Sequence, residues 1–196
     1  MNNKMKSSSW WIKRFVVFIV IFVSIMTWLY PYSTFSVYKS YSFKPYKILF
    51  NDKSYKEIVN EFKASYEKDL KDNSDNKNIN LTINRTQYIL PIFEQDWLIN
   101  KDSVSFNSMK LDSMIFEVQE VREILLKLIV QVEYTSEQRG YLVDIIRNLL
   151  SLEENIAELK NNKYITRSGL KNQFSNIYVE YTNNFRYFVT FYERSH

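Results

Sequence analysis

The sequence contains no cysteine. Disulfide bonds, thiolate nucleophiles and cysteine-ligated metal centres are therefore excluded. The single histidine, His196, is the last residue, and a chain terminus is a poor support for a general base or a metal ligand. Serine triads, Cys/His pairs and HExxH zinc motifs all need a histidine held inside a fold, so we expect no catalytic residue, no metal site and no enzyme.

Glycine and proline are also scarce, with two and three residues in a chain of 196. Sandwiches, barrels and glycine-rich phosphate loops all need turn residues, so this scarcity predicts long helices joined by short polar loops. The two glycines, Gly140 and Gly169, are isolated and form neither a P-loop nor a dinucleotide-binding fingerprint. The expected fold class is all-α, with no cofactor.

Positive charge is concentrated at the N-terminus. The chain carries 26 basic and 22 acidic side chains, and residues 1–32 contain four of the basic ones and none of the acidic ones. Those four are Lys4, Lys6, Lys13 and Arg14. The remaining 22 basic side chains are matched by 22 acidic ones, so the pI near 9.0 reflects the N-terminal tail alone. The rest of the chain shows no basic excess that would predict nucleic acid as a partner.

Phe15–Tyr30 is an uncharged, apolar run of 16 residues in which only Ser24 and Thr27 are polar. As a helix these residues span about 24 Å, which is less than the ~30 Å of a bilayer core. Extending the helix back to Trp10 gives about 31 Å, because Lys13 and Arg14 can lay their stems along the apolar zone and keep their charges at the headgroups. The sequence therefore predicts a transmembrane signal-anchor helix over residues 10–31.

The flanks of this run favour a permanent span. Aromatic residues that prefer membrane interfaces stand at both ends: Trp10 and Trp11, then Trp28, Tyr30 and Tyr32. A cleaved signal peptide is the first alternative, but the residues after Ser24, IMTWLYPYSTFS, are bulky where a peptidase needs small ones. A buried core helix is the second alternative, but it would show a polar stripe. We expect an uncleaved anchor.

The basic residues also predict the orientation of this span. Lys39, Lys44 and Lys47 on the far side are fewer and more distant than the four basic residues on the near side. By the positive-inside rule, residues 1–9 form a cytoplasmic tail and the chain from about residue 33 lies outside. The expected location is the cell membrane, as a single-pass protein with its C-terminal domain outside.

Residues 32–53 form an aromatic-rich juxtamembrane segment. Its aromatic residues are Tyr32, Phe35, Tyr38, Tyr41, Phe43, Tyr46 and Phe50. We expect this segment to pack back onto the outer domain, and a contact strip for lipid headgroups or a membrane partner is the alternative. Residues 54–196 are expected to form an extracytoplasmic antiparallel helical bundle of about four helices.

The first part of that bundle has mixed signals. A Ser54–Glu57 capping box and helical spacing predict a helix over 55–71. Residues 79–90 fit both a strand and a helical face, and Pro91 argues against one continuous helix because an interior proline costs about 3 kcal/mol. We expect an extended piece over 79–90 and a short helix from Pro91.

Three long helices are predicted with clearer patterns. Apolar residues recur at alternating steps of three and four, as in a coiled coil, over 103–133 and again over 136–161. The first of these faces is widened by Ile115, Phe116, Ile124, Ile129 and Val130, which favours a globular bundle over a two-stranded coil. Thr135 and Gln138 resemble a second capping box. A third helix over 169–193, capped by Ser168, carries an aromatic face that we expect to be core rather than a docking groove.

Carboxylates are the remaining candidates for chemistry. Two groups flank the apolar positions of neighbouring helices: Glu117, Glu120 and Glu123, and Glu153, Glu154 and Glu158. Di-iron bundles need Glu-x-x-His motifs, which are missing, so solvated faces are expected. Asp144 and Arg147 should form a surface pair. Asp69, Asp72 and Asp75 lack the glycine and closing glutamate of a calcium loop.

These features predict a non-catalytic, membrane-anchored protein that acts by protein–protein contact. Its expected partners are the bilayer and either another membrane or envelope protein or a second copy of itself. The alternative is a ligand- or lipid-binding sensor with an apolar cavity between helices, lined by Phe174, Tyr181, Phe185 and Phe188.

Overall fold

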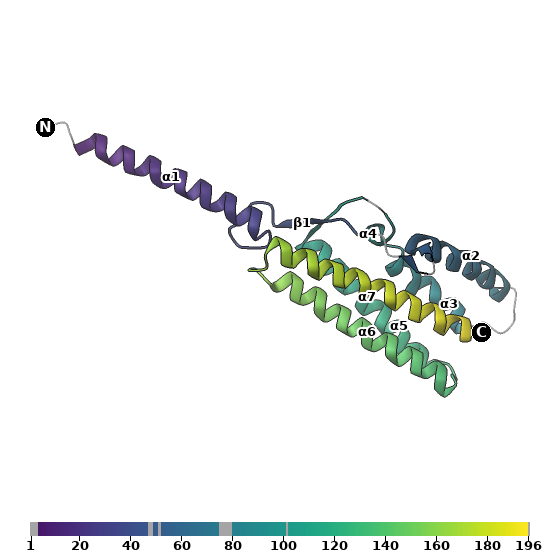
Figure 1. Cartoon of the computed structure of the whole chain (residues 1–196). Coiled ribbons are helices and arrows are strands. Elements are labelled where there is room, and N and C mark those ends of the chain that lie inside the picture. The colour runs from purple at the N-terminus through teal and green to yellow at the C-terminus, as the bar shows by residue number, and fades with distance from the viewer. Residues whose placement is uncertain (1–3, 47–48, 51, 75–79, 101, 196) are drawn as a thin grey trace.

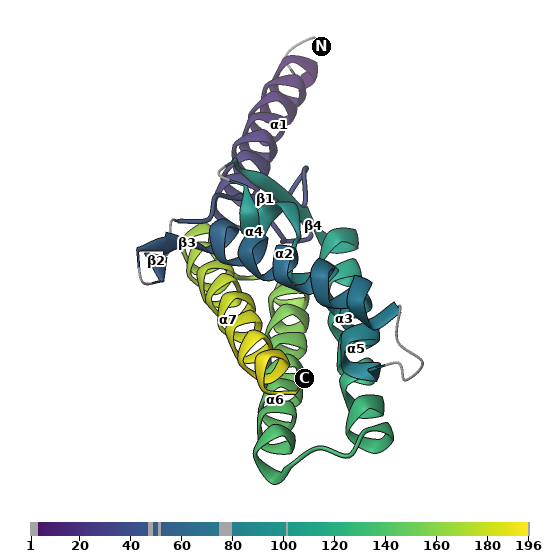
Figure 2. The ribbon, with the colours of Figure 1, turned by 90° about the vertical axis from the view of Figure 1, so that its right-hand side faces the viewer.

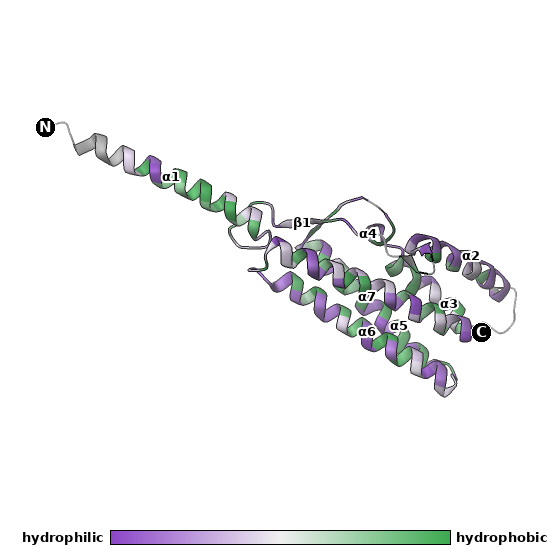
Figure 3. Cartoon of the chain, in the orientation of Figure 1, coloured by the Kyte–Doolittle hydropathy of each residue, from purple (hydrophilic) through white to green (hydrophobic). Residues whose placement is uncertain are grey.

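A computed structural model describes residues 4–46, 49–50, 52–74, 80–100 and 102–195. Helix α1 (Lys4–Leu29) projects from one end of a helical body that contains the other helices and strands of the described residues (Figure 1). Within α1, Trp10–Leu29 is long and apolar enough to cross a membrane, and none of it is buried against the body. Figure 3 shows α1 as the most continuously hydrophobic element. Its exposure contradicts a buried core helix, whereas an anchor and a signal sequence both fit.

The described part of the chain is mostly helical, as the composition predicts. The helices of the body are α2 (Tyr55–Ser74), α3 (Leu81–Ile89), the short 3₁₀ helix η1 (Leu90–Phe93), α4 (Asp96–Ile99), α5 (Ser108–Gln131), α6 (Ser136–Asn161) and α7 (Arg167–Arg194). Helices α5, α6 and α7 lie side by side, and α2 and α3 cover the remaining side of the body (Figure 2).

Helix α6 has the bounds that the sequence predicts. Thr135 accepts a hydrogen bond from the Gln138 backbone N–H at 3.2 Å, and the Gln138 side chain accepts one from the Thr135 N–H at 2.8 Å. This reciprocal capping box fixes the first turn. The Ser54–Glu57 box at the start of α2 is confirmed in the same way, with the Ser54 N–H 2.6 Å from Glu57 Oε2.

The starts of α5 and α7 differ from the predicted ones. The cap of α7 is Thr166, whose hydroxyl accepts from the Gly169 N–H at 3.1 Å, and Ser168 lies inside the first turn. The prediction of a Ser168 cap was therefore wrong. Helix α5 begins at Ser108 rather than 103, because Asn107 caps it. The residues before this cap form a strand.

Two small antiparallel sheets correct the all-α expectation. Strand β1 (Ser40–Phe43) pairs with β4 (Val104–Asn107), and β2 (Leu49–Phe50) pairs with β3 (Lys53–Ser54). In β1 the buried side chains alternate, and the rings of Tyr41 and Phe43 stack on Phe174 of α7 at 5.4 and 5.5 Å. Strand β1 therefore packs on the body, as expected of this segment.

The extended piece predicted over 79–90 is a helix where the structure describes it. Asn80 caps α3 by accepting hydrogen bonds from the N–H groups of Thr82 and Ile83. The buried face of this short helix is Thr82, Ile83, Thr86 and Ile89, so Ile83 is its only member from the described part of the alternation that resembled a strand. Pro91 lies in the 3₁₀ turn that follows the helix. Residue 79 is outside the described part of the chain.

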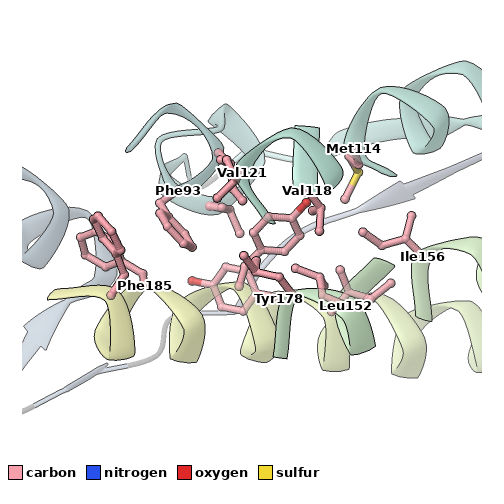
Figure 4. Close-up of a cluster of buried hydrophobic side chains, with 14 of the residues drawn as sticks. Phe93, Met114, Val118, Val121, Leu152, Ile156, Tyr178 and Phe185 are labelled. Carbon is pink, nitrogen blue, oxygen red and sulfur yellow. The ribbon is translucent and has the colours of Figure 1, made fainter. Parts of the chain in front are cut away.

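The aromatic face of α7 is the centre of the core, as predicted. None of its seven residues is more than 2% exposed: Leu170, Phe174, Ile177, Tyr181, Phe185, Phe188 and Tyr192. The ring of Phe185 contacts three other rings, those of Tyr55, Phe62 and Phe93, with centroids 5.2–5.6 Å apart. In Figure 4, Phe93 and Phe185 lie at one end of the cluster shown, and side chains of α5 and α6 meet at the other.

Truncating one core side chain tests how much this core contributes to the stability of the fold. Phe185→Ala removes a ring that contacts three others, so it should lower the free energy of unfolding by about 3–5 kcal/mol. Tyr187→Ala on the same helix is the control, because Tyr187 is exposed and its loss should cost at most about 0.5 kcal/mol. Urea unfolding of the full chain in mild detergent, followed by circular dichroism, measures both values. Equal losses in the two variants would contradict the arrangement of α7.

Candidate functional site

The carboxylates considered as chemical groups do not converge. Among the residues that the structure describes, no group of three or more His, Asp or Glu side chains is placed to hold a metal ion. Asp144 and Arg147 form the expected exposed pair at 3.2 Å. Asp69 accepts a hydrogen bond from the Tyr192 hydroxyl at 3.0 Å, and Asp75 and His196 lie outside the described residues.

Glu153 is the exception to the expected solvated faces. Its carboxylate is half-buried between α5 and α6, 3.2 Å from Arg122 Nη2, and accepts a hydrogen bond from Gln119 Nε2 at 2.5 Å. Lys160 pairs with Asp112 nearer the α1 end of the same two helices. These contacts set the register of α5 against α6, so their role is structural.

Beyond this polar seam, α5 and α6 carry an exposed apolar surface, which we call the α5–α6 face. Its members are Leu126 and Val130 on α5 and Val143 and Leu150 on α6. Leu126 lies seven residues beyond Gln119 along α5, and Ile146 lies seven residues before Glu153 along α6. The Gln119–Glu153 bond therefore places the two apolar stretches opposite each other.

The sequence signal for this face was visible but misread. Val130 falls outside the alternating steps of the buried residues and was taken as a widening of the buried face. In the structure the stepped positions of α5 from Leu111 to Leu128 are buried, whereas Val130 is 85% exposed. An apolar side chain so exposed on a regular helix contributes nothing to the core.

Charged residues of both signs surround the apolar members of the face. Glu123 and Lys127 on α5 and Asp144, Arg147 and Glu154 on α6 are all exposed. An apolar centre with a polar rim is the usual composition of a protein–protein interface. Contiguous apolar patches are rare on monomeric surfaces without such a role.

The seam between α6 and α7 is rich in hydrogen-bond acceptors. Asn155 donates to Glu180 Oε1 at 2.7 Å, but Glu180 Oε2 and the side-chain oxygens of Gln173 and Asn184 are buried without a hydrogen-bond partner. Burial raises the pKa of the Glu180 carboxyl, and the bond from Asn155 lowers it in part. A protonated Glu180 would add a hydroxyl donor among these oxygens.

The residues expected to line the cavity of a ligand sensor lie in the core. Phe174, Tyr181, Phe185 and Phe188 are all fully buried. A pocket of about 900 Å³ lies instead between the start of α2, α4 and α7, with polar as well as apolar lining residues.

A second pocket, of about 510 Å³, lies beside Glu117. Trp97 donates to Gln95 at 2.5 Å, and Gln95 in turn donates to the Glu117 carboxylate. Burial raises the pKa of Glu117, whereas Gln95 and Lys110 lower it. These groups satisfy one another, so the arrangement positions α4 against α5 and presents no free nucleophile.

Comparisons with protein-family models, with curated proteins and with solved structures find no match. The surfaces of the chain itself are what point to a function. Of these, the α5–α6 face is the strongest candidate.

The raised pKa of Glu180 predicts a pH dependence of stability. The folded state holds this proton more tightly than the unfolded chain, whose glutamate pKa is about 4.3. The contribution of Glu180 to the free energy of unfolding therefore falls as pH rises from there through the raised pKa. Glu180→Gln keeps the acceptor for Asn155 and adds an amide donor, so it should be more stable than the wild type at neutral pH.

The difference between variant and wild type should shrink as pH is lowered, because the wild-type carboxyl becomes protonated. Urea unfolding at several pH values measures this difference, and Glu193→Gln, an exposed change on the same helix, is the control. A stability difference for Glu180→Gln that does not vary with pH would refute this account of the seam.

Proposed function

We propose that this chain is a single-pass membrane protein whose antiparallel helical bundle acts by protein–protein contact through the α5–α6 face. Helix α1 remains in the bilayer as an uncleaved anchor, with the N-terminal tail in the cytoplasm and the bundle outside. The protein has no catalytic activity of its own in this proposal. The partner is another membrane or envelope protein, or a second copy of the chain.

The exposure of α1 supports the anchor. Phe15, Phe18 and Val20 are among the large apolar side chains of α1 that are more than half exposed. Burying one such side chain is worth about 1.5–3 kcal/mol, so the whole stretch would be very unfavourable in water. Near its N-terminal end, Arg14 lies over the Trp10 ring at 3.4 Å, which brings a cation and an interfacial aromatic residue together.

The α5–α6 face is the observation that carries the proposed contact. Its apolar residues stand on two of the longest helices, which are held in register by the contacts of Glu153. A partner helix could therefore dock there without ordering a loop, and so without that entropic cost. The filled aromatic core supports this proposal over the ligand sensor, which needs space between the helices.

Site-specific crosslinking tests the contact. We expect a photo-crosslinking residue at Val130 or Val143 of the full-length protein, in its own cells, to give a discrete product several-fold more abundant than one at Lys68. Lys68 is an exposed residue of α2, on another side of the body, and is the matched control. The mass of the product, with two differently tagged copies, separates self-association from a different partner.

A charge placed in the face provides the second half of this test. Leu150→Glu should reduce the product formed from Val130, because an unpaired carboxylate would then have to be buried in the contact. Glu154→Gln, a change at the exposed rim, should leave it unchanged. Equal crosslinking from Val130, Val143 and Lys68 would mean that this face is not the contact.

A further inference from the structure

The C-terminal end of α1 is tied to the body by Arg167, the first residue of α7. Its Nε donates a hydrogen bond to the Trp28 carbonyl at 3.0 Å. Its guanidinium also lies 4.7 Å from the centre of the Trp28 ring and 5.7 Å from that of Tyr41 in β1. One side chain thus joins α1, β1 and α7, so the end of the body beside α1 keeps a defined position relative to that helix.

The loop after α1 runs back along the helix. The ring of Phe35 packs against that of Phe22 at 5.4 Å, and the Val37 N–H donates to the Thr27 hydroxyl at 3.1 Å. Phe22 lies seven residues before the end of α1, which corresponds to about 10 Å along the helix axis. Residues 33–38 therefore lie beside the last two turns of α1 (Figure 1).

Exposed apolar and aromatic side chains gather at this end of the body, and we call them the α1 collar. Its members are Trp28, Phe35, Val37, Tyr38, Met109 and Tyr164. Met109 belongs here because Ser40 pairs with Asn107, just before it. Tyr164 lies three residues before Arg167. Tyr38 and Tyr164 are 78% and 80% exposed, so the collar covers none of the core.

Basic side chains accompany the collar. Lys39 and Lys163 are both exposed, and Lys163 Nζ also donates to the Lys160 carbonyl at 3.2 Å. Lys39 adopts a φ of 43°, a left-handed conformation that is unfavourable for lysine. This turn separates the loop beside α1 from β1. Apolar, aromatic and lysine side chains together are the combination that favours the headgroup layer of a bilayer.

We propose that the α1 collar lies in the outer interfacial layer of the bilayer, with residues 33–38 inserted beside α1 and Lys39 and Lys163 against phospholipid phosphates. This inference depends on the proposed membrane anchor, because α1 brings the collar to the surface. It adds that the body rests on the membrane in one orientation. The α5–α6 face is then held sideways, toward partners in the same membrane.

The absence of cysteine makes a direct test possible, since one introduced cysteine carries one spin label. We choose full-length protein in phospholipid nanodiscs, with labels at Phe18→Cys in α1, Val37→Cys and Tyr164→Cys in the collar, and Val130→Cys on the α5–α6 face. The measurement is the accessibility of each label to oxygen, which partitions into lipid, relative to a water-soluble nickel complex. All four positions are exposed on the protein, so the labels displace no core.

The ratio of oxygen to nickel accessibility should be highest at Phe18, intermediate at Val37 and Tyr164, and lowest at Val130. A low ratio at all four positions would overturn the anchor and the collar together. A high ratio at Phe18 with values at Val37 and Tyr164 equal to that at Val130 would overturn the collar alone. The two failures are therefore distinguishable.

The lysines are tested by lipid charge. Replacing half of the phosphatidylcholine by anionic phosphatidylglycerol should raise the ratio at Tyr164, because anionic headgroups attract nearby lysines. Lys39→Gln combined with Lys163→Gln should abolish that increase, whereas Lys68→Gln on α2 should preserve it. A ratio that does not respond to lipid charge, or an increase that survives loss of both lysines, would refute phosphate binding by these residues.

Discussion

The burial of one aromatic helix face is the constraint on which the body depends. With no cysteine in the chain, no disulfide reinforces the fold. Elements from several parts of the chain cover sections of α7: β1 packs on Phe174, α4 packs on Tyr181 through Trp97, and α2 packs on Phe185. Aromatic rings bury large areas with few rotatable bonds, so such a face is an efficient core for a small domain.

The parts of the fold that local signals determine could be predicted from the sequence. Helix α6 is an example, since its cap, its apolar period and its polar end all lie within one stretch. The pairing of β1 with β4 could not be predicted, because it joins segments about sixty residues apart and each strand has only four residues. Helix α3 was misjudged for a related reason: in so short a segment, the alternation of a strand and the face of a helix are hard to distinguish.

For the candidate sites too, local patterns could be predicted from the sequence, whereas features that depend on the tertiary arrangement could not. The stepped pattern of α5 correctly identified the core positions, but it did not show that Val130 points away from them, because that depends on where α6 and α7 lie. The collar is assembled from the end of α1, the following loop, the start of α5 and the turn before α7. Its aromatic loop was noted in the sequence as a possible lipid contact, whereas Met109 and Tyr164 carried no signal until the fold brought them together.

In the proposed arrangement, α1 holds the body at the outer face of a membrane. Protease added to cells with an intact plasma membrane, carrying the full-length protein with a C-terminal epitope, tests it most directly. We expect the epitope to be lost together with known surface proteins, while cytoplasmic proteins survive. An epitope that persists until the membrane is lysed would contradict it.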